Sequence, residues 1–190
     1  WVLEQSIRTF SEWRNRYGVP FVLSVNISAL QYQKEDFVET LLNIIHKYDV
    51  DPDEIELEIT ESILIDDFSA VTEKMQLLKE YGIRISLDDF GTGNSSLSLA
   101  LELPFDELKV DMSFIRDIKQ KPQNQAMVQS IVDYARRTNT ETCIEGIENK
   151  EVSDYIEQFG STWQQGYYYS KPVPIDRFEE VLREKSTEKE

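Results

Sequence analysis

Five short segments of this chain alternate apolar and polar residues in the manner of half-buried β-strands. They span residues 21–26, 55–58, 83–88, 108–111 and 142–145. In a strand, residues i and i+2 lie on the same face, so each segment has one apolar and one polar face. We expect the apolar faces to pack against helices, which leaves the polar faces on the opposite side of the sheet.

The polar faces end in side chains that suit cations or proton transfer. At the carboxyl ends of the segments stand Asn26, Glu58, Asp88, Lys109 and Glu145. Where parallel strands alternate with helices in a barrel, the carboxyl ends of the strands meet at the mouth that holds the active site. We therefore expect these five side chains to point at one spot.

Helical patterns separate the predicted strands. They cover residues 1–17, 36–48, 66–81, 96–101, 123–138, 150–159 and 175–185, and a sixth, short strand is predicted over 162–168. This alternation predicts a single α/β domain with a parallel sheet of about six strands. A closed barrel has eight strands, so either the sheet is open or its first strands precede Trp1.

The charge and composition exclude several classes of function. A net charge of −16 over 190 residues argues against binding DNA or RNA through phosphate contacts, because those contacts need a basic surface. It does not exclude a small nucleotide held by metal ions. Cys143 is the only cysteine and His46 the only histidine, which excludes an intrachain disulfide and a histidine-rich zinc site. We interpret Cys143 as a small buried strand residue and expect no membrane-spanning segment, since no apolar run nears the roughly 20 residues required.

The pair Asp88 and Asp89 is the strongest candidate for a metal site. Vicinal carboxylates before a glycine-rich segment supply the hard oxygen ligands that Mg²⁺, Mn²⁺ or Ca²⁺ prefer, although a turn or a helix cap has the same pattern. Lys109 beside them can neutralise charge or steady a water molecule, and Glu145 can accept a proton from water. Each residue alone is typical of a solvated surface, but their recurrence at five strand ends favours a divalent-metal site.

The ordered set of motifs resembles the EAL domain, the cyclic di-GMP phosphodiesterase family. The matching segments are 25–28 with Gln31, 57–62, 87–93 with 95–97, 108–111 with 113–115, 145–148, and 165–167 with 170–172. The resemblance covers nearly the whole chain. It implies a modified TIM-like (β/α) barrel that opens cyclic di-GMP to linear pGpG with Mg²⁺ or Mn²⁺, two ions per site.

The resemblance also implies a role for individual residues. Asn26, Glu58 and Asp88 would hold the first metal, and Asp88, Asp89 and Glu145 would serve the second. Lys109 would contact the attacking water, for which Glu145 is the candidate base. Gln31, Asp111, Glu148 and Gln165 would bind substrate or support the site, and Glu61 would anchor the loop after Asp88.

One departure from the family pattern concerns the beginning of the chain. The Glu-Ala-Leu segment that names the family, which carries a further metal ligand, is absent from residues 1–190. We expect it to precede Trp1 together with two strands and the helix between them, so that this is an N-terminally incomplete domain with about six of its eight strands.

The resemblance leaves open whether the protein cleaves its ligand. The alternatives are a catalytically inactive EAL-like receptor for cyclic di-GMP and a protein-interaction scaffold. The family further implies a bacterial cytoplasmic protein, a homodimer formed through the barrel, and an attached sensory or GGDEF domain.

Overall fold

Six parallel strands in chain order form the one sheet of the described chain. The protein is seen here as a computed structural model that describes residues 1–60, 63, 68–91 and 102–187. The strands are β1 (Leu23–Ile27), β2 (Ile55–Thr60), β3 (Arg84–Phe90), β4 (Glu107–Val110), β5 (Glu141–Ile144) and β6 (Trp163–Gln164). Each strand pairs with its neighbours in the order β1-β2-β3-β4-β5-β6. The parallel α/β sheet predicted from the sequence is confirmed.

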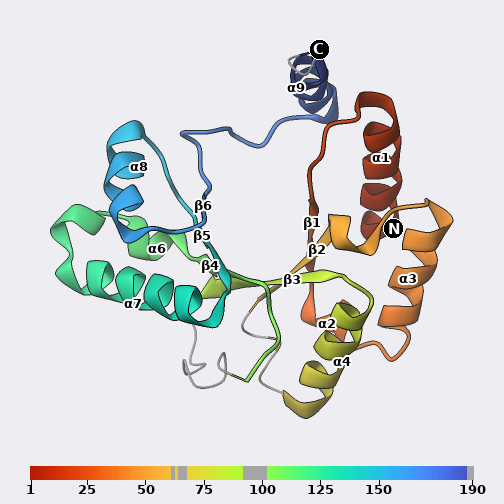
Figure 1. The fold of residues 1–190 in the computed structure, drawn as a ribbon, viewed down its shortest axis with the longest axis horizontal. Coiled ribbons are helices and arrows are strands. Elements are labelled where there is room, and N and C mark those ends of the chain that lie inside the picture. Colours follow the sequence, from red (N-terminus) through yellow and green to blue (C-terminus); the bar gives the residue numbers. More distant parts are fainter. Residues whose placement is uncertain (61–62, 64–67, 92–101, 188–190) are drawn as a thin grey trace.

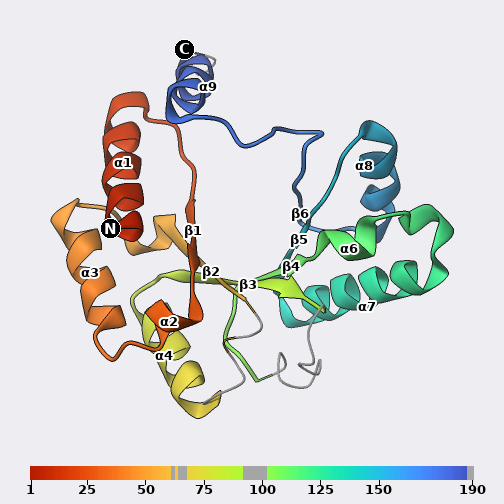
Figure 2. The same ribbon diagram turned by 180° about the vertical axis from the view of Figure 1, so that it is seen from behind.

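Helices cover the outer side of a curved sheet (Figure 1). The α-helices are α1 (Val2–Tyr17), α2 (Ala29–Tyr32), α3 (Phe37–Lys47), α4 (Phe68–Glu80), α6 (Met112–Ile115), α7 (Pro122–Thr138), α8 (Lys150–Ile156) and α9 (Ile175–Thr187). Short 3-10 turns are η1 (Pro52–Glu54), η3 (Ile118–Gln120) and η4 (Glu157–Phe159). Seen from behind, α1, α3 and α4 flank the first three strands, while α7 and α8 flank the later ones and α9 lies beside α1 (Figure 2).

The apolar parity of the strands forms the core, as the alternation predicts. Leu57, Ile85, Leu87 and Leu108 are at most 1% exposed, and they join residues of α1, α3, α4 and α7 in one hydrophobic cluster. Ile7 of α1 is also completely buried. Burial of the apolar faces of β1 to β5 against helices fixes the opposite, polar face toward the concave side of the sheet.

Several predicted boundaries differ from the structure. The strand expected over 162–168 is only Trp163–Gln164, because the chain turns away after two residues, with Tyr168 N–H donating to Ile147 O at 2.9 Å. The short helices α2 and α6 were missed, since four residues are too few to show a helical period. The helix expected over 96–101 and the first two residues of the helix expected over 66–81 lie outside the described residues.

None of the helices in the described residues is both long and apolar enough to span a membrane.

Strand β2 lies inside the sheet and should be sensitive to loss of volume. Leu57 is fully buried there, whereas Leu77 of α4 is 40% exposed. We expect Leu57→Ala to lower the free energy of unfolding by about 2–5 kcal/mol, because it leaves a cavity in the core. Leu77→Ala should cost less than about 1 kcal/mol. Urea denaturation of both variants checks this, and equal losses would contradict the placement of the core.

Candidate functional site

A buried lysine stands at the centre of the polar face. Lys109 of β4 is 4% exposed, and its ammonium contacts three carboxylates. Nζ lies 2.9 Å from Glu145 Oε1, 3.1 Å from Glu58 Oε1 and 3.6 Å from Asp88 Oδ1. These partners come from β2, β3 and the segment directly after β5. Four of the five side chains predicted to converge are therefore brought together.

The three carboxylates keep Lys109 charged. Burial disfavours the ammonium, but the hydrogen bond to Glu145 and the negative charges of Glu58 and Asp88 outweigh it, so the pKa of Lys109 is raised. Burial also raises the pKa of Glu145, against the opposing effect of Lys109. A carboxylate whose pKa lies above its ordinary range is better able to accept a proton near neutral pH.

A β-bulge places the two vicinal aspartates. In the pairing of β3 with β4, Leu87 lies opposite Leu108 and Phe90 opposite Val110, so Asp88 and Asp89 together face the single residue Lys109. Asp89 has a φ of 56°, a left-handed conformation that aspartate tolerates better than most residues. Bulges re-aim side chains next to active sites. Here the bulge places two successive carboxylates opposite one residue of β4.

Burial, and charged residues in and beside the same cluster, shift the pKa of Asp89. Its pKa is raised by burial and by the neighbouring charges of Asp88 and Asp111, and lowered by Lys109. Asp111 is also the N-cap residue of α6, and its Oδ1 accepts a hydrogen bond of 2.9 Å from Ser113 N–H.

The remaining predicted residues lie around this cluster in different ways. Asn26 pairs with Glu58 across β1 and β2, and its side chain is exposed. Gln165 lies beside Cys143, with Sγ to Oε1 at 4.0 Å. Gln31 is already engaged, because its Oε1 accepts from Ser28 Oγ–H at 2.8 Å in the capping box of α2.

One further predicted residue, Glu148, stands apart from the lysine cluster, and another lies outside the described residues. Glu148 is exposed and lines a separate hollow of about 390 Å³ between α6 and α8. Glu61 lies outside the described residues.

The sequence predictions missed a second polar layer below the lysine cluster. It comprises Ser24, Glu56, Arg84, Glu107 and Glu141. These residues have the same strand parity as the predicted site, and that alternation was the signal that could have found them. Ser86, between the two layers, is fully buried, and its hydroxyl has no partner among the described residues.

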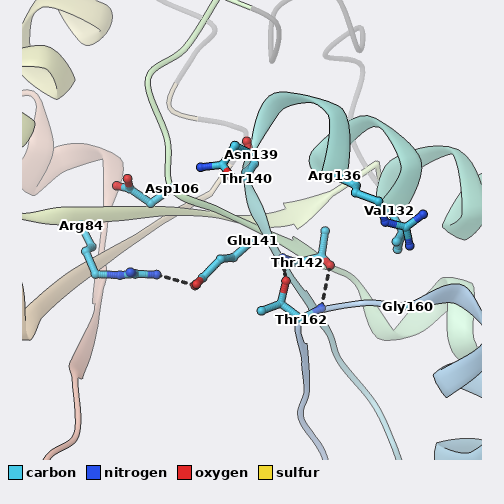
Figure 3. Close-up of a pocket in the computed structure, with 10 residues that line it drawn as sticks. All are labelled: Arg84, Asp106, Val132, Arg136, Asn139, Thr140, Glu141, Thr142, Gly160 and Thr162. Atoms are coloured by element: carbon cyan, nitrogen blue, oxygen red, sulfur yellow. Dashed lines mark hydrogen bonds and ion pairs between the residues drawn. The ribbon is translucent and has the colours of Figure 1, made fainter.

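Two hollows flank the polar layers. One, of about 360 Å³, lies on the concave face and is lined by both layers, including Glu58, Glu107 and Lys109. The other, of about 440 Å³, lies around the amino ends of β3 and β5, where Arg84 reaches Glu141 and Thr142 exchanges hydrogen bonds with Thr162 (Figure 3). Because the second hollow is at the opposite strand ends from Lys109, we place the candidate active site in the first.

Cys143 is not a nucleophile in this setting. It is 6% exposed on β5, and burial raises the pKa of its thiol to about 12. The thiol therefore stays protonated at neutral pH, and the interpretation as a small buried strand residue is confirmed.

The donor set suits a hard divalent cation in its chemistry. Glu58, Asp88 and Glu145 already converge on one positive charge, the Lys109 ammonium, and all supply oxygen. In the described part of the chain, however, no three acidic, histidine or cysteine side chains are arranged to bind a metal on their own. The chemistry of these residues therefore fits a metal site. In this structure, ion pairs to Lys109 hold the carboxylates in place.

Comparison with protein families decides the classification. The family model described as the EAL domain matches residues 1–172. The chain belongs to the EAL domain family. The resemblance seen in the sequence motifs is thereby confirmed.

Two relatives of this EAL domain carry an activity in their names. The cyclic di-GMP phosphodiesterase PA2567 of Pseudomonas aeruginosa is 33% identical over 183 residues, which cover 96% of this chain and 31% of that protein. The cyclic di-GMP phosphodiesterase PdeR of Escherichia coli is 33% identical over 179 residues, which cover 94% of this chain and 27% of that protein. The chain thus spans less than a third of the length of these relatives.

Solved EAL structures share the fold. The MucR phosphodiesterase of Pseudomonas aeruginosa, in complex with cyclic di-GMP, matches with a TM-score of 0.88 and 31% identity over 94% of this chain and 72% of that one. The EAL domain of Mycobacterium smegmatis DcpA gives 0.91 and 31%, over 97% and 83%. Klebsiella pneumoniae BlrP1, in a manganese and cyclic di-GMP complex, gives 0.77 and 28%, over 87% and 42%. The predicted barrel-like class of the EAL domain is confirmed, while the two additional strands stay a prediction.

Glu107 in the second polar layer should make stability depend on pH. Burial, and then the charge of Glu56, raises its pKa from 4.5 to about 7. The folded state therefore holds this proton more tightly than the unfolded state. Glu107 destabilises the fold progressively as pH rises from about 4.5 to 7, and the loss is complete above that window.

We expect Glu107→Gln to be more stable than the unchanged protein by about 1–3 kcal/mol at pH 8 and nearly equal to it at pH 4.5. Urea denaturation at both pH values measures the difference. Glu157→Gln, at an exposed position of η4, is the matched control and should show no such pH dependence. A Glu107→Gln effect of the same size at both pH values would contradict the raised pKa.

Proposed function

We propose that this EAL domain is the phosphodiesterase unit of a bacterial protein that hydrolyses cyclic di-GMP to linear pGpG with Mg²⁺ or Mn²⁺. The observation that carries the proposal is the convergence of Glu58, Asp88 and Glu145 on the buried Lys109 at the carboxyl ends of the strands. Two relatives named as cyclic di-GMP phosphodiesterases and the MucR complex with cyclic di-GMP support the substrate.

The proposed metal ligands are oxygen donors of β1, β2, β3 and the segment directly after β5. Asn26, Glu58 and Asp88 would hold one ion, and Asp88, Asp89 and Glu145 a second. The manganese complex of BlrP1 supports this choice of metal. When bound, two such ions neutralise the phosphodiester and activate water.

Glu145 and Lys109 would carry the proton transfer and position the water. The water oxygen forms a new bond to phosphorus, one ring P–O bond breaks, and the departing ribose oxygen takes a proton from solvent. Glu145 accepts the proton of the attacking water, a role supported by its raised pKa. The three carboxylate partners of Lys109 keep it charged. Lys109 orients that water and offsets the charge that develops on the phosphate.

The chain backbone around Glu145 supports a fixed position for this base. Gly146, the next residue, has a φ of 77°, and a Cβ there would lie 2.4 Å from Met112 Cβ. The close approach to α6 therefore requires glycine and holds the end of β5 in place. Asp111, Glu148, Gln165 and Gln31 would contact substrate or support the site, and Glu61 would anchor the loop after Asp88.

A receptor that binds cyclic di-GMP without cleaving it is the second candidate. It is favoured by one observation: among the described residues, no three acidic, histidine or cysteine side chains are arranged to bind a metal ion. Turnover separates the two functions. We also propose a cytoplasmic location, a homodimer through the barrel and an attached signalling domain, the last supported by the relative MucR, which is named as bifunctional.

The test is hydrolysis of cyclic di-GMP by the full-length protein with Mn²⁺, followed by chromatography of pGpG. We expect turnover that EDTA abolishes. Glu145→Gln, which keeps shape but removes the base, should lower kcat by roughly 100-fold or more. Lys109→Met should do the same and also destabilise the fold by about 3–5 kcal/mol, because three carboxylates lose their counterion.

The matched control for Lys109→Met is Lys47→Met. Lys47 lies on α3, and its side chain is 59% exposed and paired with Glu4, so kcat should be unchanged. Binding of cyclic di-GMP without any pGpG would favour the receptor, and absence of binding would leave a scaffold.

A further inference from the structure

The hydroxyl of Ser24 on β1 lies between two carboxylates. Its Oγ is 2.8 Å from Glu58 Oε1 and 3.0 Å from Glu56 Oε1. A serine hydroxyl has one proton to donate, and ionised carboxylates can only accept. Ser24 can therefore donate to only one of these two carboxylates at a time. The carboxylate whose other hydrogen-bond donors are weaker competes better for the proton.

Arg84 gives Glu56 an alternative donor. Its Nε donates to Glu56 Oε2 at 3.3 Å, and its Nη2 donates to Glu141 Oε2 at 2.6 Å. Figure 3 shows the guanidinium extended toward Glu141 at the amino ends of the strands. A charged donor on Glu56 lowers the gain from a second, neutral hydrogen bond. Glu58 also has a charged donor, Lys109, but that ammonium is divided among three carboxylates, whereas Arg84 is divided between two. The Ser24 contact to Glu58 is also the shorter of the two, so the Ser24 proton is directed to Glu58.

Glu58 in turn receives two donors on one oxygen. Ser24 Oγ and Lys109 Nζ, at 2.8 and 3.1 Å, both contact Oε1. Two donors from different strands fix the plane of the carboxylate as well as its position. Oε2 is then the oxygen that Glu58 can present to a cation.

We propose that Ser24 is a positioning residue for the metal site, and that Arg84, through Glu56, sets the direction of its hydroxyl. Second-sphere hydrogen bonds of this kind orient a ligating carboxylate before the ion arrives. The inference rests on the proposed function, because it takes Glu58 as a metal ligand. It extends the site by a chain of contacts from the amino ends of the strands to their carboxyl ends.

The test is Mn²⁺ affinity in the full-length protein, measured by the electron paramagnetic resonance signal of free Mn²⁺ during titration. Ser24→Ala should weaken Mn²⁺ binding roughly three- to tenfold. Ser24→Thr, which keeps the hydroxyl, should restore most of it. The matched control is Ser130→Ala, which removes an exposed α7 hydroxyl that donates to Ala126 O at 2.7 Å and should leave the affinity unchanged.

A second variant tests the direction of the hydroxyl. Arg84→Gln removes the charged donor to Glu56, so Glu56 should take the Ser24 proton and Mn²⁺ binding should weaken in the same direction. In the Ser24→Ala background, Arg84→Gln should have no further effect on affinity. Such non-additivity is expected when two changes act through one atom, whereas independent structural damage would add.

The outcomes separate the two proposals. If the unchanged protein binds Mn²⁺ and Ser24→Ala binds it equally well, the positioning role is overturned and the proposed function stands. If Ser24→Ala and Ser24→Thr weaken binding equally, the hydroxyl has no positioning role and the inference again fails. If the unchanged protein neither binds Mn²⁺ nor produces pGpG, the proposed function falls, and the positioning role with it.

Discussion

The buried ammonium of Lys109 is the interaction on which the arrangement of the concave face depends. Removing a lysine from water is costly unless opposite charges surround it, and here Glu58, Asp88 and Glu145 do so from three other parts of the sheet. The same contacts hold three carboxylates close together, which would otherwise repel one another. Stability and the proposed chemistry therefore rest on one charge, so the site cannot be rearranged without cost to the fold.

The second polar layer also sets three carboxylates against one cation, but there the effect of burial prevails at one carboxyl group. Glu56, Glu107 and Glu141 share the nearby Arg84, and Glu107 is buried with its pKa raised to about 7. A buried carboxyl group whose pKa is raised in this way destabilises the folded chain at neutral pH, where it is ionised. Its contacts through Ser24 reach Glu58, which gives a physical reason for charged residues in a region where apolar ones would stabilise the fold more.

Much of the fold was predictable because its signals are local. The period-two alternation located five strands and their buried faces. The helix predicted over residues 1–17 ends at Gly18, which has a φ of 62°. The helices α2 and α6 were not predictable from periodicity, since each is a single turn. The length of β6 also depends on a contact that sequence does not reveal, the hydrogen bond between Tyr168 and Ile147.

The sequence by itself determined the family and the parallel α/β class, and it located four side chains that meet in the lysine cluster, because strand parity and motif spacing are properties of neighbouring residues. Only the tertiary structure decided how these side chains meet. The bulge at Asp88 and Asp89 depends on the pairing of β3 with β4. The lysine-centred cluster and the Ser24 contacts join residues distant in sequence, and the distances between such residues are set by the packing of the whole sheet.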